Sequence, residues 1–334
     1  MTKRLAWLMV CSGLTACSAS SKRTSAFEDV AVEPRRPNLP AIVALMPDSP
    51  SARATYDGIV EELAEEYDVL PRFIEEDAPT SAIAGIFAAD RPSAVVLMNN
   101  PTVRLYRKFQ RESSAAERRV PAVAVLTSFL RESSGGIDNL TGIVYEVPLV
   151  TSMVNLRALL DQPVKKVGVL HRASFAAFVE EQRRLCKAEG FEVVSLEVSG
   201  DNRAEIRNGL RRLREDKAVD AIWVLNDNVL LDRDLLLRGW LPGLRGNKTP
   251  VVVNVSTLVS ERVDFGTFAV VPDHRALGTQ AAQILLGVAE SNWRVPSGSF
   301  EFPLSVQKVL DIGFARENLR VTERELATID RLVQ

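Results

Sequence analysis

The sequence is poor in the side chains from which most metal and nucleophilic sites are built. Its 334 residues include three cysteines and two histidines, and His171 and His274 lie about one hundred positions apart. There is no paired-cysteine motif, no Gly-x-Ser-x-Gly and no glycine-rich loop after the first predicted strand, which ends in Pro-Asp-Ser-Pro at 47–50. Dinucleotide, P-loop and serine-hydrolase sites depend on such signals. We therefore expect no catalytic residue, no metal ion and no cofactor, and predict that the protein is not an enzyme.

The chain also lacks an excess of positive charge. With 41 Lys and Arg against 43 Asp and Glu, its formal net charge is −2, whereas nucleic-acid-binding proteins usually carry a basic excess on one face. We expect no nucleic-acid partner. Two arginine groups, Arg118–Arg119 and Arg211–Arg214, lie among acidic residues on predicted helices, a pattern typical of a solvated surface. The 46% hydrophobic and 25% charged residues are ordinary for a soluble globular protein.

The N-terminal apolar run is too short to span a bilayer. Lys3 and Arg4 precede apolar residues 5–14, which is the layout of a signal peptide. The run ends in Leu-Thr-Ala-Cys, which resembles a bacterial lipobox and implies cleavage before Cys17 and diacylation of its sulfur. We expect residues 1–16 to be a lipoprotein signal peptide and 17–40 to be the lipidated Cys17 followed by a flexible polar tether. Acyl chains contribute roughly 0.8 kcal/mol per buried methylene, enough to hold the protein at a membrane without a spanning helix.

Removal of the signal leaves one unacylated thiol. Cys11 lies in the expected signal peptide, so Cys186 would have no intramolecular disulfide partner in the mature chain. Cys186 falls at helical spacing with the apolar residues Phe178, Val179 and Leu185. This spacing favours a small core side chain over a reactive or metal-binding thiol.

From Pro40 onward, short runs rich in β-branched residues alternate with segments of helical period. This pattern is typical of parallel sheets covered by helices on both faces. The predicted strands are Ala41–Met46, Val69–Phe73, Ala94–Met98, Ala122–Leu126 and Gly142–Tyr145 in a first half, and Val167–Leu170, Val193–Val198, Ala221–Leu225, Val251–Val255 and Thr267–Val271 in a second. The main predicted helices are 51–67, 81–90, 150–160, 175–189 and 204–215. The sequence therefore predicts an α/β fold with two doubly wound, Rossmann-like lobes.

Short polar side chains follow the predicted strands. In open parallel sheets, ligands bind outside the carboxyl ends of the strands, so two facing lobes would form a ligand-binding cleft lined by these residues. The candidate ligand-binding residues are Asn99, Asn100, Thr127, Ser128, Tyr145, Arg172, Ser174, Phe175, Asp227, Asn228 and Asn254. Asp227 could accept from an amine and Arg172 could pair with a carboxylate. Each polar residue could instead be a turn residue or helix cap, and the aromatic residues, with Phe129, could equally be hinge packing.

Several motifs resemble the substrate-binding proteins of ABC transporters typified by tryptophan and aromatic amino-acid uptake. They are Asn-Leu-Thr-Gly at 139–142, Pro-Val-Lys-Lys-Val-Gly-Val-Leu at 163–170, the strand end at 220–228, the helix at 277–282 and the tail at 309–319. The resemblance covers roughly residues 90–330 and implies a type I periplasmic-binding-protein architecture with a hinge. It implies chain crossings between lobes near 144–149, 259–266 and 296–302. Lobe 1 would then be 41–146 plus about 266–297, and lobe 2 would be 147–265 plus about 298–334.

The departures from that family fall in the predicted cleft. Asn99 and Asn100 stand where the family commonly has Thr, Ser128 and Phe129 where it has Asp-Pro, and residues 272–274 where it has Tyr. Only Asp227 and Ser174 carry over at matching positions. These changes put an aromatic amino-acid ligand in doubt while leaving the fold intact.

The expected function is capture of a small polar or amphipathic, amino-acid-like ligand by an extracytoplasmic lipoprotein of an ABC-type uptake system. The alternative is an envelope lipoprotein that uses the same fold as a sensor or scaffold partner and does not transport. We expect a monomer that is lipid-anchored in the cell envelope and faces the periplasm or the cell exterior. Its expected protein partner is an inner-membrane ABC permease or another envelope protein. Ser18 after the lipidated cysteine favours the outer membrane.

Overall fold

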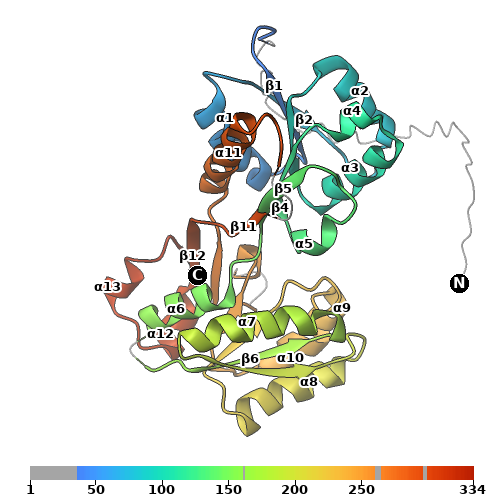
Figure 1. The fold of residues 1–334 in the computed structure, drawn as a ribbon. Coiled ribbons are helices and arrows are strands. Elements are labelled where there is room, and N and C mark those ends of the chain that lie inside the picture. The colour runs from blue at the N-terminus through green and yellow to red at the C-terminus, as the bar shows by residue number, and fades with distance from the viewer. Residues whose placement is uncertain (1–35, 161, 260–264, 296–298) are drawn as a thin grey trace, which may run out of the picture. The chain divides into compact units, whose positions relative to one another are not determined.

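The strands of this protein form two sheets, each built around buried, β-branched runs (Figure 1). The computed structural model describes residues 36–160, 162–259, 265–295 and 299–334. The expected signal peptide and Cys17 lie outside the described residues. Residues 35–334, here called the body, form one compact unit. All four buried hydrophobic clusters lie within the body, so we expect it to fold without the residues that precede it.

The first lobe contains a six-stranded sheet with the order β11-β5-β4-β3-β1-β2, and its strands pair in parallel. Its strands are β1 (Ala41–Met46), β2 (Asp68–Phe73), β3 (Ala94–Met98), β4 (Ala122–Thr127), β5 (Leu140–Val144) and β11 (Phe300–Glu301). Side chains alternate across β1: Val43 and Leu45 pack against α2 (Thr80–Asp90) and α3 (Asn100–Glu112). Ile42 and Met46 pack on the other face against α1 (Pro50–Leu63) and α11 (His274–Glu290). Helices on both faces explain why β1 is buried throughout.

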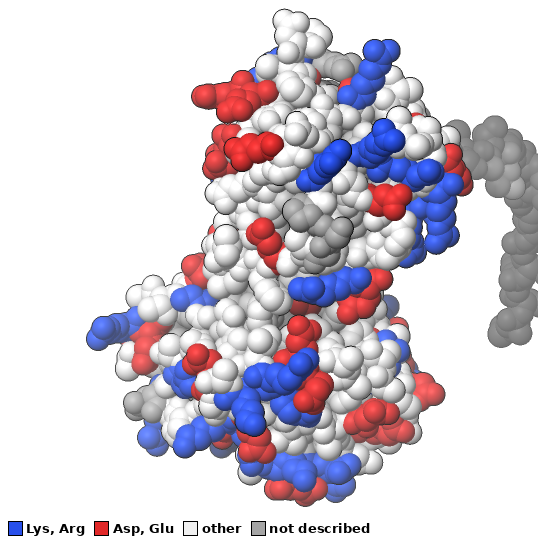
Figure 2. Space-filling view, in the orientation of Figure 1, with Lys and Arg blue, Asp and Glu red and all other residues white. Residues whose placement is uncertain are grey.

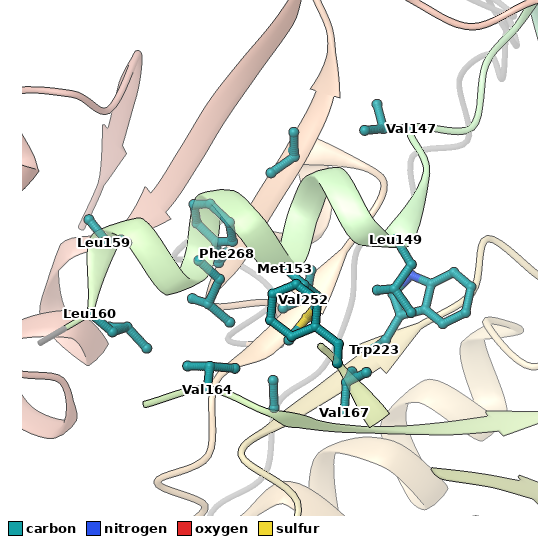
Figure 3. Packing of buried hydrophobic residues seen from close by; sticks show 14 of the residues in the cluster. Val147, Leu149, Met153, Leu159, Leu160, Val164, Val167, Trp223, Val252 and Phe268 are labelled. Atoms are coloured by element: carbon teal, nitrogen blue, oxygen red, sulfur yellow. The ribbon is translucent and has the colours of Figure 1, made fainter. Parts of the chain in front are cut away.

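The second lobe contains a seven-stranded sheet with the order β13-β12-β10-β9-β8-β6-β7, in which β10 and β12 are antiparallel. Its strands are β6 (Lys166–His171), β7 (Glu192–Glu197), β8 (Ala221–Val224), β9 (Val251–Val253), β10 (Phe268–Pro272), β12 (Val306–Asp311) and β13 (Arg331–Val333). Helices α6 (Leu149–Leu159) and α7 (Ala176–Ala188) cover one face, where Met153 packs with Val167, Val252 and Phe268 (Figure 3). Helix α8 (Arg203–Arg211) covers the other face.

The remaining helices are short. They are α4 (Ala115–Arg118), α5 (Leu130–Ser133), α9 (Arg233–Leu235), α10 (Leu241–Leu244), α12 (Ile312–Asn318) and α13 (Glu323–Leu326), with 3-10 turns at Ala173–Phe175 and Ser256–Leu258 and π-helical turns at Arg212–Asp216 and Leu236–Trp240. No helix in the described ranges combines the length and apolar character needed to cross a bilayer.

The predicted α/β fold with two parallel-sheet lobes is confirmed, but one chain crossing differs from the one expected. The chain passes between the sheets after β5, within the range 144–149. The second crossing was expected near 259–266, yet β10 pairs with β9 and β12 in the second sheet, so the chain leaves that sheet only after Pro272. In the last crossing, β11 still pairs with β5, so the chain leaves the first sheet after Glu301, within the expected range 296–302. The segment from 266 to 272 therefore belongs to lobe 2, and residues 300–301 to lobe 1.

The expected tether also ends earlier than residue 40. The Arg36 backbone N–H donates to the Asp68 carboxylate at 3.0 Å, and its guanidinium donates to the carbonyl oxygens of Ala64 and Tyr67. Residues 36–40 are thus fixed to the first lobe beside the start of β2.

Candidate functional site

Polar residues at the carboxyl ends of both sheets meet through one hydrogen bond. Ser128 directly follows β4 in the first lobe, and Asn226 follows β8 in the second. The Asn226 side-chain amide donates to the Ser128 hydroxyl at 3.1 Å. Because both residues stand at strand ends of parallel sheets, this contact marks the place where the two lobes approach each other.

In the first lobe, the two predicted asparagines organise the loops. Asn99 has a φ of 91°, and its side chain accepts from the Thr102 N–H at 2.9 Å, which caps α3. The Asn100 side chain donates to the Ser128 carbonyl at 2.7 Å and accepts from the Ser128 N–H at 3.0 Å. Thr127 is fully buried and donates to the Val125 carbonyl. The Asn100 side chain thus holds the Ser128 backbone in place, while the Ser128 hydroxyl accepts from Asn226.

In the second lobe, the two predicted ions pair with each other. The Arg172 guanidinium donates to both Asp227 carboxylate oxygens, at 2.7 and 2.8 Å, and Asp227 also accepts from the Val229 N–H at 2.9 Å. Asp227 is 1% exposed, so burial makes this bidentate pair stronger than a surface ion pair. The pair raises the pKa of Arg172. A ligand amine would have to compete with Arg172 for this carboxylate.

The other predicted polar residues differ in exposure. Ser174 and Asn228 are exposed. Asn254 is 6% exposed, and its side-chain carbonyl oxygen has no hydrogen-bond partner among the described residues. A buried acceptor without a partner is unfavourable by roughly 1–3 kcal/mol. Asn254 is therefore the predicted site residue with the most evident unused capacity to bind a polar group.

Aromatic side chains from both lobes form a second contact between the strand ends. The Phe129 ring lies 5.0 Å from the Phe175 ring and 5.4 Å from the Phe178 ring in edge-to-face arrangements. The Arg172 guanidinium lies over the Phe175 ring at 5.5 Å. Sequence reasoning missed Phe178 and Asn226. Phe178 lies three residues after Phe175 along the chain, and Asn226 immediately precedes Asp227, so local spacing could have indicated both.

Two further residues lie at the first crossing. The Tyr145 hydroxyl lies 3.2 Å from the His274 imidazole, and the two rings are stacked with centroids 6.1 Å apart. Glu146 is 7% exposed and accepts from the Phe129 N–H at 2.9 Å. Burial raises the pKa of Glu146 to about 7. Tyr145 thus packs in the hinge, and Glu146 links the hinge to the aromatic contact.

The described residues contain no group of three or more His, Cys, Asp or Glu side chains placed to hold a metal ion. The site therefore offers hydrogen bonds, one ion pair and aromatic faces, which are the groups that orient a small ligand.

The fold of this chain resembles that of several proteins of known structure. No protein-family model matches the chain, and no curated protein matches it. Solved structures do match, and they share with this chain the two-lobed type I periplasmic-binding-protein architecture. A substrate binding protein with adhesive properties from Clostridium difficile, solved in a ligand-free, open form, is 16% identical with a TM-score of 0.64. The match covers 89% of this chain and 99% of that one.

Two further solved structures match most of this chain. An ABC domain from Streptococcus pneumonia in complex with L-Trp is 19% identical over 88% of this chain and 100% of that one, with a TM-score of 0.50. A conserved domain protein from Vibrio cholerae is 18% identical over 88% of this chain and 99% of that one, with a TM-score of 0.52. At these identities the likeness is one of fold.

Proposed function

We propose that the protein is an extracytoplasmic solute-binding lipoprotein that captures a small polar or amphipathic ligand between its lobes for an ABC permease. The observation that carries this proposal is the meeting of strand-end side chains from both lobes at Ser128 and Asn226. A ligand stabilises lobe closure only by its differential affinity for the closed state, so contacts must come from both lobes. One solved structure with this fold holds L-Trp, which supports the capture of a small ligand by such a fold.

The chemistry of the strand ends supports an amino-acid-like ligand. Asn254 offers a buried carbonyl oxygen that can accept from an amine. Arg172 can turn part of its guanidinium toward a carboxylate, since its side chain is 27% exposed. The rings of Phe175 and Phe178 provide an apolar surface beside these groups. None of these residues forms a nucleophile–base pair, and we propose binding without catalysis.

Ligand screening of the purified body by thermal unfolding tests capture directly. A ligand at one hundred times its Kd stabilises the folded state by about 2.7 kcal/mol, which corresponds to a rise in Tm of roughly 5 °C for a chain of this size. The panel should contain amino acids, short peptides, sugars and purines. A rise for one chemical class supports the proposal and defines the ligand. The absence of any rise argues for the second candidate below.

A variant pair then locates the site. Asn254→Ala removes the buried acceptor and should abolish the ligand-induced rise in Tm. Asn208→Ala, on the exposed face of α8, makes the same chemical change away from the strand ends and should leave the rise intact. Equal effects of both substitutions would place the ligand elsewhere.

The lipid anchor is a separate part of the proposal, and it depends on the Leu-Thr-Ala-Cys motif. Labelling with a palmitate analogue should mark the wild-type protein and fail in the Cys17→Ala variant, which should also be released from the membrane fraction. Fractionation of the wild type would show whether Ser18 directs it to the outer membrane.

A non-transport sensor or scaffold is the second candidate, and one observation favours it. Within the second lobe Asp227 is already paired with Arg172. Between the lobes, Phe129 already contacts Phe175 and Asn226 donates to Ser128, so the lobes contact each other through their own side chains. An envelope partner recovered by crosslinking, together with no ligand response, would support this candidate.

A further inference from the structure

Positive charge is concentrated on one side of the first lobe. Residues 100–120, which include α3 and α4, carry six basic and two acidic side chains, a formal excess of four positive charges in a chain whose net charge is −2. Figure 2 shows Lys and Arg side chains gathered over the side of the lobe where α3 and α4 lie, while acidic side chains gather toward α1. Such separation of charge within one lobe favours an oppositely charged partner.

Three arginines line a cavity of about 800 Å³. Asn139 also lines it and forms hydrogen bonds to two segments of its wall. The cavity is lined by Arg118, Arg119 and Arg294, with Asp138 and Trp293. The Asn139 side-chain amide donates to the carbonyl oxygens of Arg119, at 2.6 Å, and Trp293, at 3.2 Å, and its oxygen accepts from the Val295 N–H at 2.9 Å. One side chain therefore joins the turn after α4 to the turn after α11.

Two of these arginines, Arg119 and Arg294, have no ion-pair partner among the residues that the structure describes, whereas Arg118 has one. Arg118 lies 3.8 Å from the exposed Asp138 carboxylate and donates to the Ser113 carbonyl. Arg119 and Arg294 are exposed, and neither guanidinium forms an ion pair with any residue that the structure describes. Two free guanidinium groups at one cavity are suited to phosphate, which they can bind in a bidentate manner.

The chain enters the lobe beside this surface. Trp293 lines both the arginine cavity and a second cavity of about 430 Å³, which Pro40 and Tyr67 also line. The Tyr67 and Trp293 rings meet edge to face at 6.2 Å. Glu66 and Glu290 line only the second cavity, so the basic surface ends where the second cavity begins. The end of the tether and the basic surface therefore lie at the same end of the first lobe.

We propose that Arg118, Arg119 and Arg294 form a surface that docks the body onto anionic phospholipid headgroups. Two features favour a lipid surface over another anionic partner. Tryptophan and tyrosine are enriched where proteins meet the membrane interface, and a tether that starts beside Tyr67 brings this end of the lobe nearest to an anchored lipid. The second argument relies on the lipid anchor of the proposed function. Each basic residue near an anionic bilayer strengthens binding about fivefold.

The test uses the unacylated body, residues 35–334, with vesicles of 30% phosphatidylglycerol in phosphatidylcholine and with pure phosphatidylcholine vesicles. Co-sedimentation should occur only with the anionic vesicles and should fall as salt increases. The double variant Arg119→Glu/Arg294→Glu should bind at least about tenfold more weakly. Its matched control is Arg211→Glu/Arg212→Glu, which makes the same charge change at two exposed residues of the second lobe and should bind like the wild type.

Tryptophan fluorescence provides a second readout. Of the three tryptophans in the body, Trp223 and Trp240 are 0% and 1% exposed, whereas Trp293 is half-buried. Brominated anionic lipids should quench Trp293 and spare the other two, and the quenching should disappear in Trp293→Phe. No binding to anionic vesicles, or equal weakening by both double variants, would overturn the inference. Ligand capture and Cys17 labelling are measured separately, so neither result depends on this outcome.

Discussion

The Asp227 carboxylate, 1% exposed, accepts from Nε and Nη2 on one edge of the Arg172 guanidinium, at 2.7 and 2.8 Å. The partners are 55 positions apart and belong to the loops after β6 and β8. The pair therefore fixes two neighbouring strand ends of the second lobe relative to each other, and it places the Arg172 guanidinium over Phe175.

Removing one partner of this pair should be strongly destabilising, because it leaves a buried charge uncompensated. In a double-mutant cycle with Arg172→Ala and Asp227→Ala, we expect a coupling energy of about 2–3 kcal/mol in urea unfolding. The pair Arg203–Asp234 has the same chemistry but side chains that are 44% and 43% exposed. Its coupling should stay below about 1 kcal/mol. Similar couplings for both pairs would mean that burial contributes little at Asp227.

Much of the fold could be predicted because its cause is local. Runs of β-branched residues mark β1 and β3 with the bounds that the structure has, and the strand-end rule of parallel sheets selected the loops at Asn99, Ser128 and Asp227. The alternating pattern placed the strand at 267–271 in the second half, as the structure has it. The lobe boundary implied by the resemblance, which placed residues from about 266 in the first lobe, was wrong because the sheet to which a strand belongs depends on its pairing with distant strands. In this chain β12 pairs with β10 from almost 40 positions away.

The site was less accessible to sequence reasoning for the same reason. A strand-end position shows that Asp227 and Arg172 face the cleft region, but nothing local shows that they bind each other. The role of Asn99 as a cap at a φ of 91° is likewise set by the backbone after β3. Side-chain roles that depend on contacts between loops need the three-dimensional structure.

Helices α1 and α11 approach each other closely at two glycines, Gly58 in α1 and Gly278 in α11. A Cβ atom on Gly278 would lie well inside van der Waals contact of the Thr55 carbonyl oxygen. Because that atom belongs to the backbone, it cannot rotate away, and Gly278→Ala should lower the free energy of unfolding by about 3 kcal/mol, the upper end of the usual cost of overpacking. Gly287 lies in the same helix with nothing within 4 Å of its Cβ position. Gly287→Ala should be neutral or raise stability by up to about 1 kcal/mol.

The thiol of Cys186 should be unreactive in the folded body. It is completely buried among apolar side chains, and burial raises its pKa to about 12. Since the thiolate is the reactive form, its reaction with a disulfide reagent at pH 8 should be roughly a thousandfold slower than that of an exposed thiol. The body contains no other cysteine, so the reagent counts this thiol alone. Rapid reaction without denaturant would show that the helix α7 region opens readily.

Glu146 should make the stability of the body depend on pH. Burial raises its folded-state pKa from a usual 4.5 to about 7, so the folded state holds this proton more tightly than the unfolded state. The free energy of unfolding should therefore be highest below about pH 4.5 and should fall as the pH rises to about 7, by roughly 3 kcal/mol from this group.

The variant Glu146→Gln isolates this contribution because it keeps the oxygen that accepts from the Phe129 N–H and cannot ionise. Urea unfolding should show that the free energy of unfolding of the variant, relative to that of the wild type, is roughly 3 kcal/mol higher at pH 8 than at pH 4.5. Glu62→Gln, at an exposed position of α1, should follow the wild type at both. If Glu146→Gln also follows the wild type, Glu146 is ionised at little cost in the folded protein. The hinge would then open enough to hydrate it.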